Sequence, residues 1–293
     1  MEFGVHLPNV GPLASRYNIL TIARRAEERG FHSLWTSDHI VIPLRTDSAY
    51  PGGRFPVRPE MLFLEPLSVL HFAAAVTERV RLGTSVLVVP MRHPIITAKE
   101  LATLDVLSGG RLIFGAGVGW LKEEFDILGA PFHHRGPRTD EYLEVIVRCW
   151  TEEEPRFEGR FIRLDNVGFA PKPLQKPRPP IWIGGTADGA LRRAARIGDA
   201  WQATGPLTPQ QLARLYGRVQ QYASEYGRDP ASILFSVRSD NLSRMEKEEA
   251  VAYLQALREI GVQHLVVAFP GRRLEDSLAL MDRFLEEIAP AAA

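Results

Sequence analysis

Cysteine is nearly absent from this sequence, which has a single one, Cys149, among 293 residues. A lone cysteine forms no intramolecular disulfide and offers no cysteine-based metal site, so the sequence indicates a reducing compartment. Nowhere do about 18 apolar residues run together, and the N-terminus lacks a basic segment followed by an apolar one. We therefore expect a soluble, cytoplasmic protein without a membrane span.

An excess of charge of either sign is also missing, because 35 Lys and Arg residues balance 35 Asp and Glu residues. A neutral chain lacks the long-range field that draws proteins to nucleic acid or to anionic membranes. We expect a small-molecule substrate and neither nucleic acid nor a membrane as partner. A net charge of zero does not exclude a local basic pocket that binds a phosphate group.

Short β-branched segments alternate with helical stripes along the whole chain, and no boundary interrupts them. This pattern predicts an α/β protein with one domain over residues 1–293, built as a (β/α)8 TIM barrel. A doubly wound open sheet of eight strands is the alternative. The predicted strands are 3–7, 33–37, 81–88, 112–117, 181–184, 200–203, 234–238 and 265–269.

Two segments exceed ordinary loop length and predict insertions after strand two and before strand five. Residues 42–61 are rich in Gly and Pro and would lie over the face where barrel active sites form. Residues 154–180 contain a small hairpin pattern centred on 157–161, followed by a Pro-rich extended stretch. The alternative is that both insertions only decorate the surface.

Few titratable groups follow the predicted strands, at the end where barrel enzymes place their active sites. Strand one offers only His6, whereas hydrolytic metal barrels typically need a His-x-His pair there, so we expect no catalytic metal. No strand end offers a Lys for a Schiff base. Glycine is abundant instead, with 24 residues, which favours an organic cofactor that carries the chemistry itself.

Two glycine-rich turns are candidates for contact with such a cofactor. The turn Gly184-Gly185-Thr186 precedes a helical pattern whose first N–H groups can bind a phosphate, although a simple tight turn is the alternative. Residues 115–119 read Gly-Ala-Gly-Val-Gly, but no helix follows in the required register, so a Rossmann fold is not predicted. Glycines at this position would let a flat ring lie against the barrel mouth.

Four segments in this order together resemble the luciferase-like monooxygenase superfamily, most closely its branch that depends on the deazaflavin coenzyme F420. They are WTSDHIVIP, RLGTSVLVVPMRHP, GAGVGWLKEEFDILG and FAPKPLQKPRPPIWIGGTADGALRRAARIGDAW. The resemblance implies a TIM barrel that holds F420 and transfers a hydride to or from a small organic substrate. An FMN-dependent monooxygenase and a noncatalytic flavin-binding protein are the alternatives.

The resemblance also implies roles for individual residues. Asp38 would contact the cofactor ring, and His39 would be the catalytic proton donor or acceptor, a task that suits an imidazole at neutral pH. His6 is its rival, and a purely structural His39 is the alternative. The bond from Ser85 to Val86 would be a cis peptide behind the ring. The other implied cofactor-binding residues are Gly117, Val118, Gly119, Trp120, Gly184, Gly185, Thr186, Thr204 and Gly205.

Two departures from the family pattern leave the substrate open. Deazaflavin-dependent sugar-phosphate dehydrogenases have a Trp a few residues after the His, where this chain has Ile42 and Pro43. They have a Glu acid after strand four, where this chain has Lys122 or its neighbours.

Family members are commonly dimers, and we expect a homodimer formed through apolar residues of helices two and three, with a wide buried face in a monomer as the alternative. These residues are Leu67, Leu70, Phe72, Leu101, Leu104 and Leu107.

Overall fold

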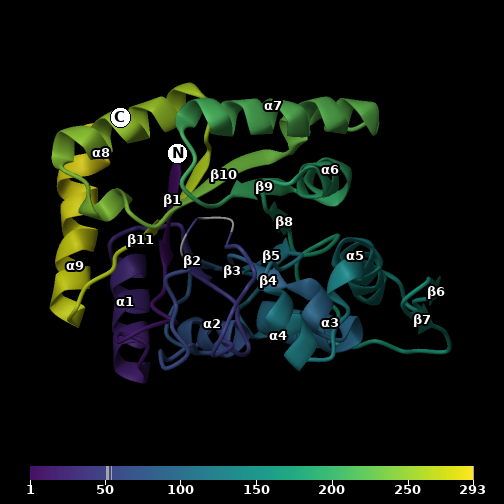
Figure 1. Ribbon diagram of the computed structural model, residues 1–293. Helices are drawn as coiled ribbons and strands as arrows, with labels where there is room; N and C mark the ends of the chain where they lie inside the picture. The colour runs from purple at the N-terminus through teal and green to yellow at the C-terminus, as the bar shows by residue number, and fades with distance from the viewer. Residues whose placement is uncertain (51–52, 54, 293) are drawn as a thin grey trace.

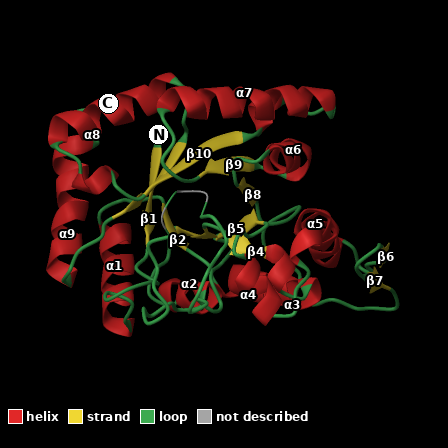
Figure 2. Ribbon diagram, viewed as in Figure 1, coloured by secondary structure: helices red, strands yellow, loops and turns green. Residues whose placement is uncertain are grey.

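A closed ring of parallel strands forms the centre of the computed structural model, which describes residues 1–50, 53 and 55–292. The strands follow one another in the order β3-β2-β1-β11-β10-β9-β8-β5, and a pairing between β3 and β5 closes the ring. The predicted (β/α)8 barrel is confirmed (Figures 1 and 2). The barrel strands are β1 (Glu2–His6), β2 (Ser33–Thr36), β3 (Arg81–Thr84), β5 (Leu112–Gly117), β8 (Ile181–Gly184), β9 (Ala200–Ala203), β10 (Leu234–Ser239) and β11 (His264–Ala268).

Helices surround this ring, and a proline opens several of them. Pro94 is the first residue of its helix, a position where a missing N–H costs nothing. A short helix, α4 (Lys122–Ile127), follows β5. The others are α1 (Arg16–Glu28), α2 (Pro66–Ala74), α3 (Pro94–Leu107), α5 (Arg135–Thr151), α6 (Asp188–Ile197), α7 (Pro209–Glu225), α8 (Lys247–Glu259) and α9 (Leu274–Arg283). Single turns are η1 (Val89–Met91), η2 (Phe132–His134), η3 (Pro230–Ser232), η4 (Leu242–Arg244) and η5 (Phe284–Ile288).

The predicted third strand is interrupted near its end. It divides into β3 and β4 (Leu87–Val88), and the Ser85–Val86 peptide bond between them is cis, as the resemblance implied. Between the pairs Leu82↔Leu112 and Leu87↔Ala116, this strand contains one residue more than β5. The extra residue makes a bulge that turns side chains at the barrel mouth in a new direction.

The insertion before strand five contains the predicted hairpin, formed by β6 (Phe157–Glu158) and β7 (Arg163–Leu164). It projects beside α5, away from the barrel (Figure 1). The Glu141 carboxylate of α5 accepts the backbone N–H groups of Arg160 and Phe161, which anchors the hairpin turn. The insertion after strand two includes residues 51, 52 and 54, which lie outside the described residues. Its far end is fixed by the bridge between Val10 and Phe63.

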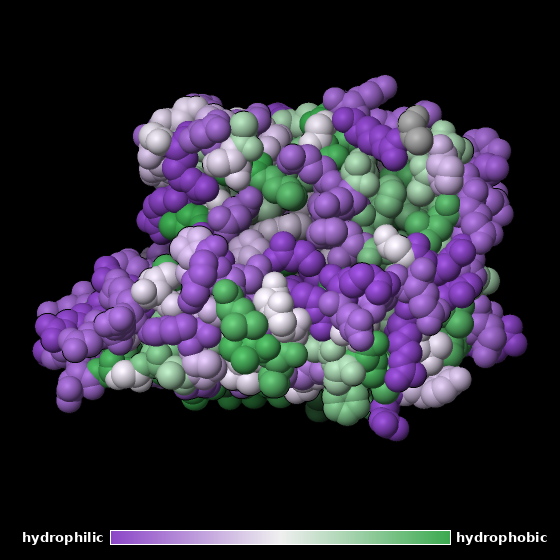
Figure 3. All heavy atoms as spheres, turned by 180° about the vertical axis from the view of Figure 1, so that it is seen from behind, coloured by the Kyte–Doolittle hydropathy of each residue, from purple (hydrophilic) through white to green (hydrophobic). Residues whose placement is uncertain are grey.

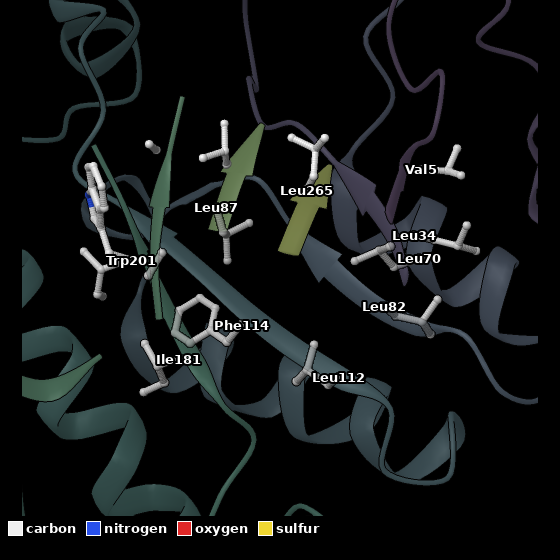
Figure 4. Packing of buried hydrophobic residues seen from close by; sticks show 14 of the residues in the cluster. Val5, Leu34, Leu70, Leu82, Leu87, Leu112, Phe114, Ile181, Trp201 and Leu265 are labelled. Carbon is white, nitrogen blue, oxygen red and sulfur yellow. The ribbon is translucent and has the colours of Figure 1, made fainter. Parts of the chain in front are cut away.

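Two apolar layers hold the barrel together. The outer layer packs strand side chains against helices, for example Leu34 of β2 beside Leu70 of α2 (Figure 4). The inner layer fills one end of the barrel with Trp35 and Trp182, whose ring centroids are 4.9 Å apart. A Cβ atom at Gly83 would lie 2.4 Å from the Trp35 ring, so this glycine makes room for it. Because large side chains fill this end, a ligand enters at the other end.

Only part of the apolar surface predicted on α2 and α3 is exposed. Leu67, Leu70, Leu101 and Leu104 are buried in the core, whereas Phe72 and Leu107 are 51% and 68% exposed. The alternative of a wide buried face therefore accounts for four of the six residues. Figure 3 shows hydrophobic side chains gathered along the lower half of one face. Within the described residues, no helix is both long and apolar enough to cross a bilayer.

Candidate active site

His39 follows β2 at the barrel mouth, where its imidazole meets a carboxylate from α4. Its Nδ1 atom lies 2.7 Å from Oε2 of Glu124, and the two side chains are 11% and 2% exposed. The second oxygen, Oε1, accepts the backbone N–H groups of Ile40 and Val41 at 2.6 and 3.1 Å. One buried carboxylate thus orients the ring and also fixes the turn that follows it. Nε2, at the other edge of the ring, is not part of this contact.

Asp38 is paired with an arginine from the segment after β4. Its buried carboxylate binds the Arg92 guanidinium in a bidentate pair at 2.6 and 2.8 Å and accepts the Val88 N–H at 2.8 Å. Burial raises the pKa of Asp38, while Arg92 and the Val88 N–H oppose that rise. Glu124, and not the neighbouring Asp38, therefore orients the His39 ring. Asp38 instead ties the end of β2 to the segment after the bulge.

The prediction of a mouth poor in carboxylates is also wrong. Beside Glu124, the carboxylate of Glu123 accepts the N–H groups of Asp47 and Ser48 at 2.7 and 3.0 Å and so holds the insertion after β2. Although desolvation opposes it, hydrogen bonding by Ser48 and by backbone N–H groups lowers the pKa of Glu123 to about 2. The signal in the sequence was the Glu123-Glu124 pair, separated from Gly119 by three residues, since carboxylates are favoured in the first turn of a helix.

A hydrogen-bond network links His6 to the bulge. His6 Nε2 lies 2.8 Å from the Ser37 hydroxyl, and Nη1 of Arg238 donates to that hydroxyl and to the Ser85 carbonyl at 2.8 and 2.9 Å. Arg238 also pairs with Asp240 at 2.8 Å. Burial and the Arg238 charge lower the pKa of His6 to about 3. His6 is thus neutral near pH 7, with its Nε2 bonded to the Ser37 hydroxyl.

Val86 fills the space over two of the predicted cofactor-binding glycines. A Cβ atom at Gly117 would lie 2.4 Å from Val86 Cγ2, and one at Gly184 would lie 2.5 Å from Val86 Cγ1. Gly119 has φ +77°, and its Cβ would lie 2.7 Å from the Phe125 ring. Glycine at these positions therefore has a packing reason that is independent of a bound ring.

Two buried polar side chains at the same end of the barrel have no hydrogen-bond partner among the described residues. They are the Ser85 hydroxyl and the Gln202 amide, with exposures of 4% and 0%. Gln202 pairs in register with Gly184, one strand away. Buried polar groups are nearly always hydrogen-bonded in native proteins, so such groups fit a ligand with ring carbonyl and N–H groups. A flavin or deazaflavin ring has both.

The predicted phosphate loop lies between β8 and α6. Gly185 has φ +113°, and its carbonyl accepts the Trp201 indole N–H at 2.8 Å. No side chain caps α6, so the N–H groups of Asp188 and Gly189 can bind an anion, whereas that of Ala190 bonds to the Ala187 carbonyl. The Asp188 side chain is paired with Arg192. Thr186, Thr204 and Gly205 follow the adjoining strands β8 and β9.

Aromatic rings enclose His39, and we call Tyr50, Phe55, Phe63 and Trp120 the aromatic cluster. The centroids of Phe55, Phe63 and Trp120 lie 5.1, 5.5 and 6.1 Å from that of the imidazole. Tyr50 packs on both Phe55 and Trp120, at 5.2 and 5.0 Å. Val118 of the predicted cofactor set precedes Trp120 by two residues and is half-buried. Among the described residues, no group of three potential metal ligands is present.

Known proteins share this architecture and sequence pattern. A dimethylsulfone monooxygenase of Pseudomonas putida that depends on FMNH2 is 30% identical over 65% of this chain and 52% of its own length. An F420-dependent glucose-6-phosphate dehydrogenase of Intrasporangium calvum is 28% identical over 91% of this chain and 92% of its own. The crystal structure of monooxygenase RslO1 from Streptomyces bottropensis superposes with a TM-score of 0.79 and 26% identity over the whole of both chains.

The comparison with protein families agrees with the barrel fold. The family described as luciferase-like monooxygenase matches residues 1–288. The two enzymes from Pseudomonas and Intrasporangium depend on FMNH2 and on F420, respectively. This chain belongs to the luciferase-like monooxygenase family.

Proposed function

We propose that this protein is an oxidoreductase that exchanges a hydride between F420 and a small organic substrate, with His39 as the catalytic acid or base. The observation that carries the proposal is the buried contact of Glu124 with Nδ1 of His39, which leaves Nε2 for the substrate. The full-length similarity to an F420-dependent dehydrogenase supports the choice of cofactor.

The proposed cofactor site combines the bulge, the glycines and the phosphate loop. Ser85 and Gln202 would bind the polar edge of the ring, Val86 would lie behind it, and the start of α6 with Gly185 would bind the phosphate. The remaining members of this site are Asp38, Gly117, Val118, Gly119, Trp120, Gly184, Thr186, Thr204 and Gly205. When bound, a deazaflavin accepts or donates a hydride at carbon 5 of its ring.

A side chain of the protein transfers the proton that accompanies the hydride. In the oxidative direction, Nε2 of His39 takes the proton of a substrate hydroxyl, while Nδ1 stays bonded to Glu124. The buried carboxylate stabilises the imidazolium that forms and holds the ring in one orientation. In the reductive direction the same nitrogen returns the proton.

Fluorescence titration of the purified protein with F420 and with FMN tests the cofactor. We expect F420 to bind with micromolar or tighter affinity and FMN to bind more weakly. FMN that copurifies with the protein, with no binding of F420, would instead favour an FMN-dependent monooxygenase, the function of the Pseudomonas relative. Binding of either cofactor without any turnover would favour a noncatalytic flavin-binding protein.

Substitution of His39 tests the catalytic assignment. His39→Ala should keep the affinity for the cofactor and lose about 10²–10⁴-fold in turnover, the usual contribution of a general acid or base. His6→Ala is the comparison, because His6 lies at the same mouth but is held neutral. If His39→Ala turned over at the wild-type rate and His6→Ala lost turnover, His6 rather than His39 would be the catalytic acid or base.

A further inference from the structure

Arg238, near the end of β10, extends its guanidinium group into the barrel mouth. Its Nη1 atom donates to the Ser37 hydroxyl at 2.8 Å and to the Ser85 carbonyl at 2.9 Å. These two serines follow β2 and β3, so one side chain connects the ends of three strands. The side chain of Arg238 is 16% exposed. Its positive charge therefore lies inside the mouth and not in the solvent.

The carboxylate that pairs with Arg238 lies nearer to the solvent. Nε of Arg238 donates to Oδ1 of Asp240 at 2.8 Å, and the Asp240 side chain is 54% exposed. Water screens an exposed charge more strongly than a buried one. Asp240 therefore compensates the charge of Arg238 only in part, because the guanidinium faces the mouth and the carboxylate faces the solvent.

Two titratable neighbours indicate the sign of the field that this pair produces. Burial lowers the pKa of His6, and Arg238 lowers it further by more than Asp240 raises it. Burial raises the pKa of Tyr50 in the aromatic cluster, and Arg238 opposes that rise by more than Asp240 adds to it. The net field of the pair is thus positive at both side chains.

The guanidinium of Arg238 lies next to the proposed site for the polar edge of the cofactor ring. Ser85, whose carbonyl it binds, also has the buried hydroxyl that is proposed to bind this edge. A hydride brings two electrons and one proton to carbon 5, so the ring gains one negative charge, which its pyrimidine edge carries. A cation beside that edge stabilises the reduced ring more than the oxidised ring.

From this arrangement we propose that Arg238 stabilises the reduced form of the cofactor and so raises the reduction potential of the bound ring. The inference rests on the proposed function, because it uses the cofactor site described there. Asp240 has the opposite effect, since its negative charge weakens the field of Arg238 at the ring. Arg238 thus favours transfer of the hydride from the substrate to the cofactor.

The dissociation constants of oxidised and reduced F420 test this inference. Quenching of tryptophan fluorescence under anaerobic conditions measures both constants, and no turnover is needed. We expect Arg238→Gln to weaken binding of reduced F420 at least about tenfold more than binding of oxidised F420. For a two-electron couple, a tenfold change in this ratio lowers the potential of the bound cofactor by about 30 mV.

Asp240→Asn should change the same ratio in the opposite direction, by roughly twofold or more. The asparagine keeps the size of the side chain and a carbonyl oxygen for Nε of Arg238, but it has no charge. A side chain that only supports the fold gives no such reversal of sign. If Arg238→Gln does not fold, Asp240→Asn decides alone, and an unchanged ratio in this variant would refute the inference.

Arg244→Gln is the matched control. Arg244 belongs to η4, shortly after β10, and its exposed guanidinium binds the Pro270 carbonyl. This variant loses the same charge in a place where water screens it, so its ratio should stay within about twofold of the wild-type ratio. Equal weakening of both forms of F420 in Arg238→Gln, or shifts of the same sign in Arg238→Gln and Asp240→Asn, would overturn the inference.

The same titrations separate this inference from the proposed function. If F420 binds and Arg238→Gln affects both of its forms equally, the inference fails and the proposed function stands. If FMN binds in place of F420, the ratio is measured with oxidised and reduced FMN, because the two rings share the pyrimidine edge. An unequal response to FMN then supports the inference and counts against F420 alone. Failure of both cofactors to bind would count against the inference and the proposed function together.

Discussion

His39 and Glu124 are 85 residues apart in the sequence, yet Nδ1 of the one lies 2.7 Å from Oε2 of the other. The contact joins the end of β2 to α4, the short helix after β5. Because Glu124 also holds the N–H groups of Ile40 and Val41, the orientation of the imidazole and the path of the following loop depend on the same carboxylate. Glu124 is therefore a positioning residue for His39.

We expect Glu124→Gln to lower kcat by about 10–100-fold while KM and the dissociation constant of F420 change little. The amide keeps the size of the side chain but has no charge to stabilise an imidazolium. Steady-state kinetics and cofactor titration measure the three constants. Glu123→Gln is the control, since the Glu123 carboxylate binds the N–H groups of Asp47 and Ser48, whereas His39 is bonded to Glu124. Loss of cofactor binding in parallel with kcat would show that Glu124 only stabilises the fold.

The features that the sequence predicts well are local ones. The strand over residues 181–184, the helix that begins at Pro94 and the hairpin near 157 follow from periodicity, proline and turn residues within a few positions. The roles of Glu124 and Arg92 depend on which loops meet at the mouth, and no local pattern encodes that meeting. The bulge at Ser85 was implied only by the family resemblance, because one extra residue barely disturbs the apolar pattern of residues 81–88.

The phosphate loop gives a prediction with a matched pair of variants. Gly185 has φ +113°, so any side chain there strains the backbone. Gly185→Ala introduces this strain alone, whereas Gly185→Asp adds a negative charge where a phosphate is proposed to bind. We expect Gly185→Asp to bind F420 at least about 1–3 kcal/mol more weakly than Gly185→Ala, as measured by fluorescence titration. Equal affinity of the two folded variants for F420 would show that the phosphate does not bind at Gly185.

Stability should fall in mild acid because of a buried imidazole at the filled end of the barrel. His264 contacts the hydroxyls of Ser33 and Ser236 at 2.8 and 3.1 Å, and burial, with the charges of His32 and Arg81, lowers its pKa to about 3. Between about pH 3 and the unfolded value near 6.5, the unfolded state binds the proton and the folded state does not. Stability therefore rises with pH in this window and is lost as pH falls through it.

This loss is measurable by urea unfolding. From pH 7 to about pH 5, His264 should account for about 2 kcal/mol of the decrease in unfolding free energy. His264→Gln should be less stable than the wild type at pH 7. Its unfolding free energy should, however, decrease by about 2 kcal/mol less than that of the wild type between pH 7 and about pH 5. His93→Gln is the control, because His93 is exposed. An identical pH dependence in His264→Gln and the wild type would contradict the prediction.

We expect a homodimer in solution that covers the exposed apolar residues of α2 and α3. Phe72, Ile96 and Leu107 are 51%, 59% and 68% exposed, and apolar surface of this kind is typical of subunit contacts. Light scattering at micromolar concentration should give a mass near twice the 32.8 kDa of one chain. Leu107→Glu should shift the mass toward the monomer. A monomeric wild type would rule out the dimer and leave the three residues as ordinary surface.

The glycines at the mouth can be assigned to packing or to cofactor contact by a double-mutant cycle. The packing interpretation depends on Val86, whose Cγ2 atom lies 2.4 Å from the position of a Cβ at Gly117. Gly117→Ala should then destabilise the protein by about 1–3 kcal/mol, since extra atoms in a filled space force the neighbours to move. Urea unfolding gives this value, and titration with F420 gives the effect on binding.

Val86→Ala removes both methyl groups of that side chain, and its Cβ would remain 3.4 Å from a Cβ at Gly117, an ordinary contact. The double variant should therefore be more stable than the sum of the two single changes predicts, with a coupling energy of at least about 1 kcal/mol. If Gly117→Ala leaves stability unchanged but weakens F420 binding whether or not Val86 is truncated, the glycine is needed for the cofactor ring. If the destabilisation by Gly117→Ala disappears when Val86 is truncated, the bulge, rather than a ligand, requires glycine at this position of β5.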